Sequence, residues 1–137
     1  MPAILYPNTG SLWLAGVVQA ALANSEVHLF QSGSVTLTPL TVLADLTAAE
    51  ADYTGYALET VTAWFDPLLN PLGGASIESG LLQFSIDAPY TVSNMIGGWW
   101  VEETGGELVC AGEFPTPRPL AGAGDGIPFN IELVFGG

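Results

Sequence analysis

The chain has 137 residues and carries 14 acidic side chains against a single basic one, so its formal net charge is −13. It contains no lysine, and Arg118 is the only arginine. Binding to DNA or RNA through phosphates requires clustered lysine and arginine, as does adhesion to anionic lipid, so both classes of partner are excluded. A hydrophobic fraction of 49% is enough for a packed core, and the length suits one domain.

A helix is predicted near the start of the chain, over residues 12–23. Leu14, Val18 and Leu22 recur at helical spacing on one face, and residues 8–11 offer polar side chains for an N-cap. The apolar run is shorter than the about 20 residues that a membrane-spanning helix needs, so we expect no membrane partner.

The residues before this helix are predicted to form an extended N-terminal arm, residues 1–10. Pro2 and Pro7 disfavour helical conformations in the residues that precede them. Residues 11–137 show no internal repeat and no interdomain linker, so we expect them to form a single domain.

Beyond residue 24 the hydrophobic pattern changes to a period of two, which is typical of half-buried strands. Thr47–Glu50 has the spacing of a capping box and predicts one helical turn. We therefore predict a mainly β protein, an antiparallel β-sandwich or jelly-roll-like single domain with one N-terminal helix. The predicted strands cover residues 26–31, 35–38, 57–65, 82–87, 91–103, 107–113 and 127–135.

Glycine and proline mark the irregular parts of this pattern. Gly97 and Gly98 predict a bulge within an extended stretch, and Thr104–Gly106 predicts a tight hairpin turn. Alternating prolines indicate that residues 114–120 form a sheet edge or a polyproline-like crossover. The predicted loops cover residues 66–74 and 121–126.

Few side chains suit catalysis or metal binding. His28 is the only histidine and Cys110 the only cysteine, so a zinc site built from several such ligands is not expected. His28 is interpreted as structural because no nucleophile motif accompanies it. The adjacent Glu102 and Glu103 point to opposite faces of a strand and cannot act as a glycosidase pair. Calcium stays open because it takes oxygen ligands, although no EF-hand pattern occurs. We predict no catalytic residue, no metal site and no cofactor.

The predicted strand over residues 91–103 contains two adjacent tryptophans. Trp99 and Trp100 must point to opposite faces, so one is predicted to face the core and the other outward. Large aromatic side chains outside the core are typical of protein interfaces. We interpret the outward tryptophan as an interface residue, with stacking on a sugar or a position under a loop as the alternatives.

A series of segments between about residues 12 and 135 carries a resemblance to a known family. Its most specific part is the block of residues 43–57, which begins Leu-Ala-Asp-Leu-Thr and ends Tyr-Thr-Gly-Tyr-Ala. The other segments are Leu12–Asn24, Val27–Phe30, Thr36–Pro39, Ile96–Val101, Gly105–Gly106, Glu113–Pro115 and the alternating C-terminal strand. In this order they resemble small tailed-phage virion structural proteins, most of all the head decoration (cement) proteins.

The resemblance implies a structural role and no enzymatic activity. It implies a decoration protein on the outer surface of the phage capsid, which binds the major capsid protein and forms a homotrimer. A tail or fibre component with a host-glycan-binding role is the alternative, and a glycan-cleaving enzyme ranks below both. The residues expected at the interface are Tyr6, Trp99, Trp100, Pro117, Arg118 and Pro119.

Overall fold

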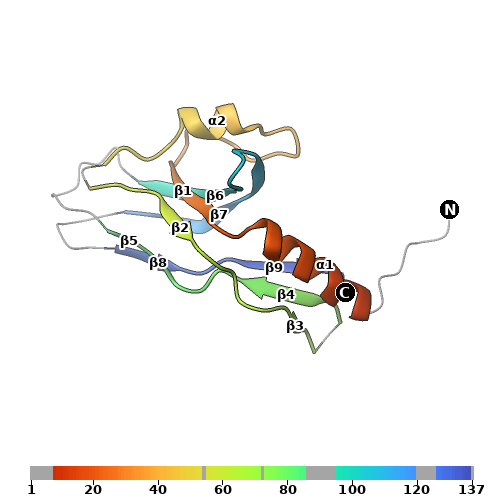
Figure 1. The fold of residues 1–137 in the computed structure, drawn as a ribbon. Coiled ribbons are helices and arrows are strands. Elements are labelled where there is room, and N and C mark those ends of the chain that lie inside the picture. Colours follow the sequence, from red (N-terminus) through yellow and green to blue (C-terminus); the bar gives the residue numbers. More distant parts are fainter. Residues whose placement is uncertain (1–7, 54, 72, 86–94, 120–125, 137) are drawn as a thin grey trace.

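The computed structural model describes residues 8–53, 55–71, 73–85, 95–119 and 126–136 (Figure 1). The fold is mainly β, with antiparallel sheets and one N-terminal helix, as the sequence predicts. Its elements are α1 (Asn8–Ala21), β1 (Ser25–Gln31), α2 (Leu43–Ala48), β2 (Glu59–Val61), β3 (Leu68–Leu69), β4 (Ala75–Glu78), β5 (Leu82–Ser85), β6 (Ile96–Glu102), β7 (Leu108–Arg118), β8 (Gly126–Phe129) and β9 (Glu132–Phe135).

One layer is a four-stranded antiparallel sheet in the order β2-β1-β6-β7. Its two central strands pair so that His28 lies opposite Trp100 and Glu26 lies opposite Glu102. The predicted hairpin turn joins β6 to β7, where the Gly106 N–H donates to the Glu103 carbonyl at 2.8 Å. The turn therefore sets the register of the edge strand β7.

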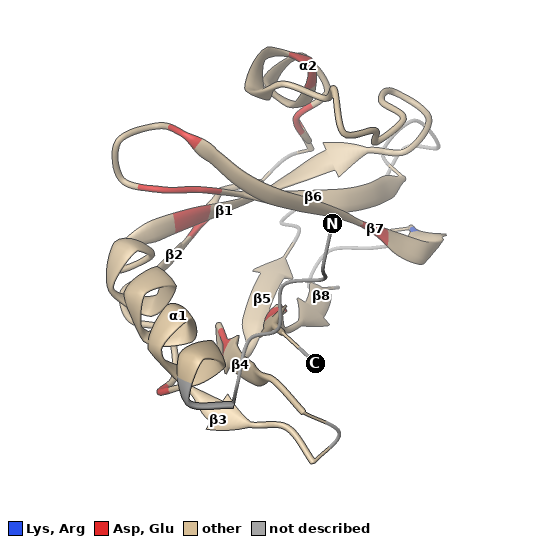
Figure 2. Ribbon diagram, turned by 90° about the vertical axis from the view of Figure 1, so that its right-hand side faces the viewer, with Lys and Arg blue, Asp and Glu red and all other residues tan. Residues whose placement is uncertain are grey.

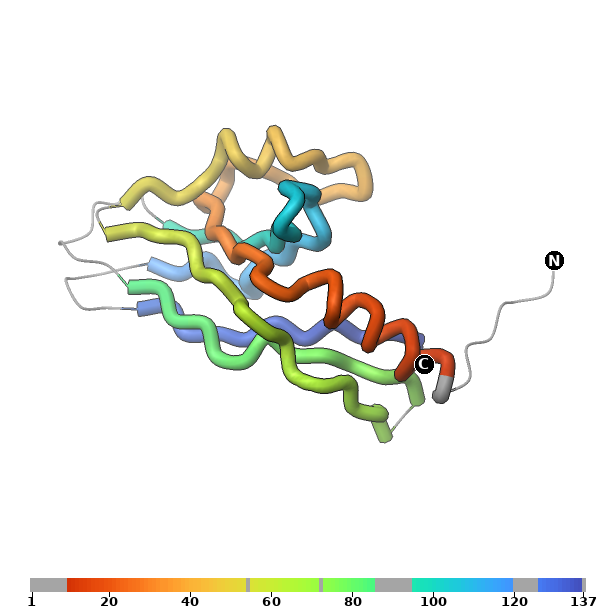
Figure 3. Tube along the Cα trace, viewed as in Figure 1, coloured from red at the N-terminus to blue at the C-terminus, as the bar shows by residue number. Residues whose placement is uncertain are grey.

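The second layer is a long antiparallel ribbon. β4 pairs with β9 and β5 pairs with β8, and each strand of the ribbon continues into the next along the chain (Figures 1 and 3). The short strand β3 adds to the outer edge of β4. The main hydrophobic core lies between this ribbon and the four-stranded sheet, which gives a sandwich-like arrangement of two layers.

The two helices cover different parts of the sandwich. α1 packs on β4 and β9, and its Ala15 is fully buried. α2 lies over the opposite face of the four-stranded sheet, where Leu46 packs with Phe30 and Trp100 (Figure 1). The four-stranded sheet is consequently covered on both faces, which explains why β1 is buried along most of its length.

α1 begins at Asn8, inside the segment that the sequence predicts as an extended arm. Ser11 is already buried there, and a side chain at Gly136 would collide with it, so the first turn of the helix is part of the packed structure. The rest of the predicted arm, residues 1–7, lies outside the described residues, as do residues 121–125 of the predicted loop 121–126, whose last residue, Gly126, begins β8.

Several predicted elements differ from the structure. Residues 35–38 form no strand, and most of 57–65 is irregular outside β2. The predicted helical turn at 47–50 is displaced to α2, because the Asp45 carboxylate accepts the Val42 N–H at 3.1 Å and starts the helix earlier. Residues 86–87 and 91–94 of two predicted strands lie outside the described part of the chain.

The C-terminal strand is divided at its centre. The Ile131 N–H donates to Ser79 Oγ at 3.0 Å and the Ser79 N–H donates to the Ile131 carbonyl at 2.9 Å, so the ladder changes partner between β8 and β9. The opposite strand is divided at the same level by Gly80, which has a φ of +79°. The predicted alternation of burial still runs through both halves.

Proline and glycine act in the sheet as the sequence predicts. β7 runs through Pro115 and Pro117 to Arg118, and it can do so because it is the edge strand and no further strand needs their missing N–H groups. The register between β6 and β7 shifts between Ile96 and Gly98, which confirms the predicted bulge.

Candidate functional site

The most unusual cluster of side chains in the described structure surrounds His28 on the sheet face that α2 covers. Glu26 and His28 alternate along β1 and therefore share a face, and Glu102 lies opposite Glu26 on β6. Glu50 follows α2 in the chain and reaches the same face through a bridge between its backbone and Phe30. Three carboxylates thus converge on one imidazole.

The Nδ1 side of the ring is held by hydrogen bonds. Nδ1 lies 2.5 Å from Glu50 Oε2, and this same oxygen accepts the Tyr56 hydroxyl at 2.7 Å. The Tyr56 hydroxyl in turn accepts the Leu29 N–H at 3.1 Å. Because a carboxylate only accepts, Nδ1 carries a proton and donates to Glu50.

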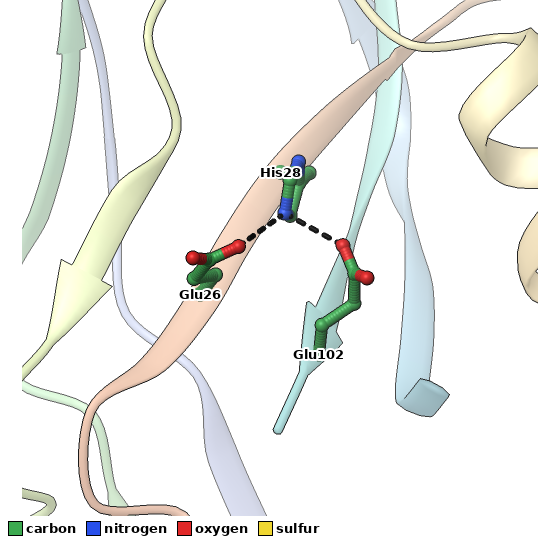
Figure 4. A group of neighbouring side chains, drawn as sticks. All are labelled: Glu26, His28 and Glu102. Carbon is green, nitrogen blue, oxygen red and sulfur yellow. Dashed lines mark ion pairs between the residues drawn. The ribbon is translucent and has the colours of Figure 1, made fainter. Parts of the chain in front are cut away.

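The Nε2 side of the ring is different. Nε2 lies 2.7 Å from Glu102 Oε2 and 3.4 Å from Glu26 Oε2 (Figure 4). Neither approach has the alignment of a hydrogen bond, so among the described residues Nε2 has no hydrogen-bond partner. His28 is only 6% exposed, and water therefore has little access to this nitrogen.

Trp100 fixes the plane of the imidazole and the position of one carboxylate. Its ring stacks on His28 with centroids 4.7 Å apart and planes 7° apart. Its indole N–H donates to Glu102 Oε2 at 3.2 Å. Trp100 is fully buried, so both contacts are made by a side chain that cannot rotate freely.

The neighbouring tyrosines stay protonated. Burial raises the pKa of Tyr56 far above its usual value of 10.0, and the nearby Glu50 raises it further, while the hydrogen bond from Leu29 acts in the opposite direction. Burial, followed by the charge of Glu59, raises the pKa of Tyr53 to about 12. Tyr56 therefore remains a hydrogen-bond donor to Glu50 at every physiological pH.

This arrangement is suited to holding a cation. With His28 neutral, the three carboxylates carry a charge of −3 around it, and both ring nitrogens face carboxylate oxygens. His28 is therefore not arranged to activate a hydroxyl nucleophile. Figure 2 shows the acidic positions on β1, β2 and the β6–β7 hairpin, whereas α1 carries none.

The structure places the predicted interface residues in several different environments. Trp99 and Trp100 point to opposite faces of β6, and neither side chain is exposed. Trp100 lies beneath α2, and the half-buried Trp99 lies against Gly112 and 6.3 Å from the Phe129 ring. Both faces of β6 are covered, which a pattern confined to one strand does not reveal.

The proline-rich end of β7 is more accessible. Pro117 and Pro119 are exposed, and Arg118 is half-buried, with its guanidinium 4.4 Å above the Phe114 ring and a hydrogen bond to the Pro128 carbonyl at 3.3 Å. Tyr6 lies outside the described residues.

The grouping of Glu26, His28 and Glu102 is absent from the sequence-based candidates. One histidine and one cysteine predict no zinc site, and Glu102 forms no carboxylate pair with its sequence neighbour Glu103. The sequence does show that Glu26 and His28 alternate on one predicted strand and therefore share a face. It does not show that Glu102 joins them, because that depends on the β1–β6 register.

Comparisons with protein families, with curated proteins and with solved structures found no match. Within the described ranges, every helix is too short or too polar to cross a membrane.

Proposed function

We propose that the protein is a structural component of a phage virion, a decoration protein that binds the major capsid protein on the outer surface of the head. The observation that supports this proposal is the outward face of α1, formed by Trp13, Val17, Ala20 and Ala21. Trp13 is 71% exposed and Val17 48% exposed, although α1 contains no charged residue on any side.

A helix whose outward face is apolar normally has that face covered. Among the described residues, α1 packs against β3, β4 and β9 on one side, and Trp13 and Val17 on the other side stay exposed. The nearby strand β3 adds Leu68 and Leu69, both exposed, next to the same helix. A binding partner would cover this apolar surface and remove it from water, which is the main source of affinity between protein surfaces.

The chemistry of the surface favours a protein partner. The chain has one arginine and no lysine, so it lacks the groups that bind phosphates. Many copies on a regular shell would also act together, so that a modest contact at each site yields a stable lattice. The trimeric arrangement belongs to this proposal, with association favoured by added salt, because three copies at −13 each repel one another.

A tail or fibre role with glycan binding depended on an outward tryptophan on β6. Trp100 is fully buried and Trp99 half-buried, so no specific observation favours this alternative.

The first experiment measures the copy number of this chain in purified particles, relative to the major capsid protein. A ratio near one to one supports the decoration role, whereas a few copies per particle move the protein to a tail or fibre. Absence from particles refutes the virion proposal.

The second experiment tests the α1 face itself. Shells lacking the protein are mixed with the wild type, with Trp13→Ala, or with Leu40→Ala as a matched control, since Leu40 is 86% exposed but lies far along the chain, before α2. We expect Trp13→Ala to weaken shell binding at least tenfold and Leu40→Ala to leave it unchanged. Equal binding by all three proteins would remove α1 from the interface.

A further inference from the structure

We propose that Glu26, His28 and Glu102 form a binding site for one divalent transition-metal ion. One potential ligand atom from each residue lies within 4.8 Å of the other two. The set combines an imidazole nitrogen with two carboxylate oxygens, a mixture that suits zinc and its neighbours in the first transition row.

The first support is the state of His28 Nε2. Nδ1 holds a proton by donating to Glu50, so Nε2 is the ring nitrogen whose lone pair can bind a metal ion. Figure 4 shows Nε2 turned toward the space between the two carboxylates. This buried nitrogen has no hydrogen-bond partner among the described residues. A lone pair facing two anionic oxygens is unfavourable unless a cation lies between them.

The second support is the spacing of the atoms. Ligand atoms bonded to one zinc ion at ~2.0–2.2 Å are separated by roughly 3–3.5 Å. The distance from Nε2 to Glu26 Oε2 is 3.4 Å, and that to Glu102 Oε2 is 2.7 Å. A single ion bound by all three atoms therefore requires the Glu102 oxygen to move slightly away from Nε2.

The third support is the set of groups that orient the ligands. Histidine ligands of metals usually donate their other N–H to a carboxylate, as His28 does to Glu50. Tyr56 holds Glu50, and the Trp100 indole holds Glu102. The side chain of Glu26 is 46% exposed, so this ligand can be reached from solvent. The bound ion would join β1 to β6.

The test is a zinc titration of the full-length chain, with any affinity tag removed and metal stripped by a chelator. Isothermal calorimetry at pH 7 should give one equivalent of zinc per chain. We expect His28→Gln and Glu102→Gln each to weaken binding more than tenfold, and zinc to raise the melting temperature of the wild type but not of these variants.

Two further variants make the test specific. Glu107→Gln removes one negative charge from an exposed position outside the cluster and should leave the affinity unchanged. Glu26→Gln alters the most exposed ligand and should weaken binding even if substitution of the buried His28 prevents folding. Glu50 is a positioning residue, and Glu50→Gln should weaken binding about 10–100-fold.

Two results would overturn the proposal. One is the absence of saturable zinc binding by the folded wild type, which would mean that a proton on Nε2 is the only cation in this space. The other is equal zinc affinity in the wild type, Glu26→Gln and Glu107→Gln, which would indicate unspecific binding to an acidic surface.

Discussion

Replacing Tyr56 with phenylalanine removes the hydroxyl that connects the Leu29 backbone to Glu50, the carboxylate that binds His28. That hydroxyl accepts the Leu29 N–H at 3.1 Å and donates to Glu50 Oε2 at 2.7 Å. Leu29 is fully buried, so its N–H would be left without an acceptor, at a cost of about 1–3 kcal/mol. Glu50 is partly exposed, and water replaces its lost donor in part, so we add about 1 kcal/mol. The expected loss in the free energy of unfolding is therefore about 2–4 kcal/mol.

Tyr53 provides a matched control three residues earlier. Its ring packs edge-on against Tyr56 at 5.3 Å, and it is also buried. Its hydroxyl, however, has no hydrogen-bond partner within the described part of the chain. Tyr53→Phe removes a buried polar group that gains nothing from the fold, so its stability should lie within about 0.5 kcal/mol of the wild type or exceed it.

Urea unfolding followed by tryptophan fluorescence measures both variants under the same conditions. Similar losses in the two variants would show that ring packing, and not the Tyr56 hydroxyl, supports this region. A loss below about 0.5 kcal/mol in Tyr56→Phe would show that the Leu29 N–H finds another acceptor, and the assigned network would then be incorrect.

Three other predictions concern ionisation and packing. Because the pKa of Tyr53 is raised from 10.0 to about 12 in the folded state, the folded protein holds this proton more tightly than the unfolded chain. Its contribution to stability is therefore complete below pH 10 and lost as the pH rises toward 12. Unfolding measured between pH 9 and 12 should show this decline, and Tyr53→Phe should reduce it; an identical pH profile in the variant would contradict the assignment. Burial raises the pKa of the Cys110 thiol from 9.0 to about 11, so at pH 8 the reactive thiolate is about 100-fold scarcer than in the unfolded chain. Iodoacetamide should label the folded protein correspondingly more slowly, and equal rates with and without urea would refute this. A methyl group on Gly98 would collide with the Gly112 carbonyl and the Phe30 ring, whereas one on Gly16 in α1 meets nothing within 4 Å. We therefore expect Gly98→Ala to destabilise the fold by at least about 2 kcal/mol and Gly16→Ala to stabilise it by about 0.5–1 kcal/mol. Thermal unfolding of both variants measures these changes. If both variants shifted the stability in the same direction, the reasoning would be refuted.

Local pattern was a good guide wherever an element depends on its own residues. The period-two alternation in residues 82–85 and 127–135 predicted strands with one buried face, and the structure has β5, β8 and β9 there. The turn at Thr104–Gly106 and the bulge at Gly98 were also predictable, because glycine is placed where the backbone conformation or a close approach demands it.

Local pattern failed where a partner decides the structure. β4 has the sequence Ala-Ser-Ile-Glu, which contains two poor strand formers, yet it is buried between α1 and the main core and pairs with β9 and β3. Residues 35–38 show the opposite case, since their β-forming composition finds no neighbouring strand. Intrinsic strand propensity is weak, and pairing with another strand overrides it.

The sequence alone determined the mainly β class, the N-terminal helix and the strongly acidic charge. The His28 cluster was decided only by the tertiary structure. Its groups come from β1, from the segment after α2 and from β6, so their meeting depends on sheet order and strand register. The tertiary packing also covers Trp100 and half-buries Trp99, and among the described residues it leaves Trp13 and Val17 of α1 exposed. These features depend on contacts between residues far apart in the chain, and no local periodicity encodes them.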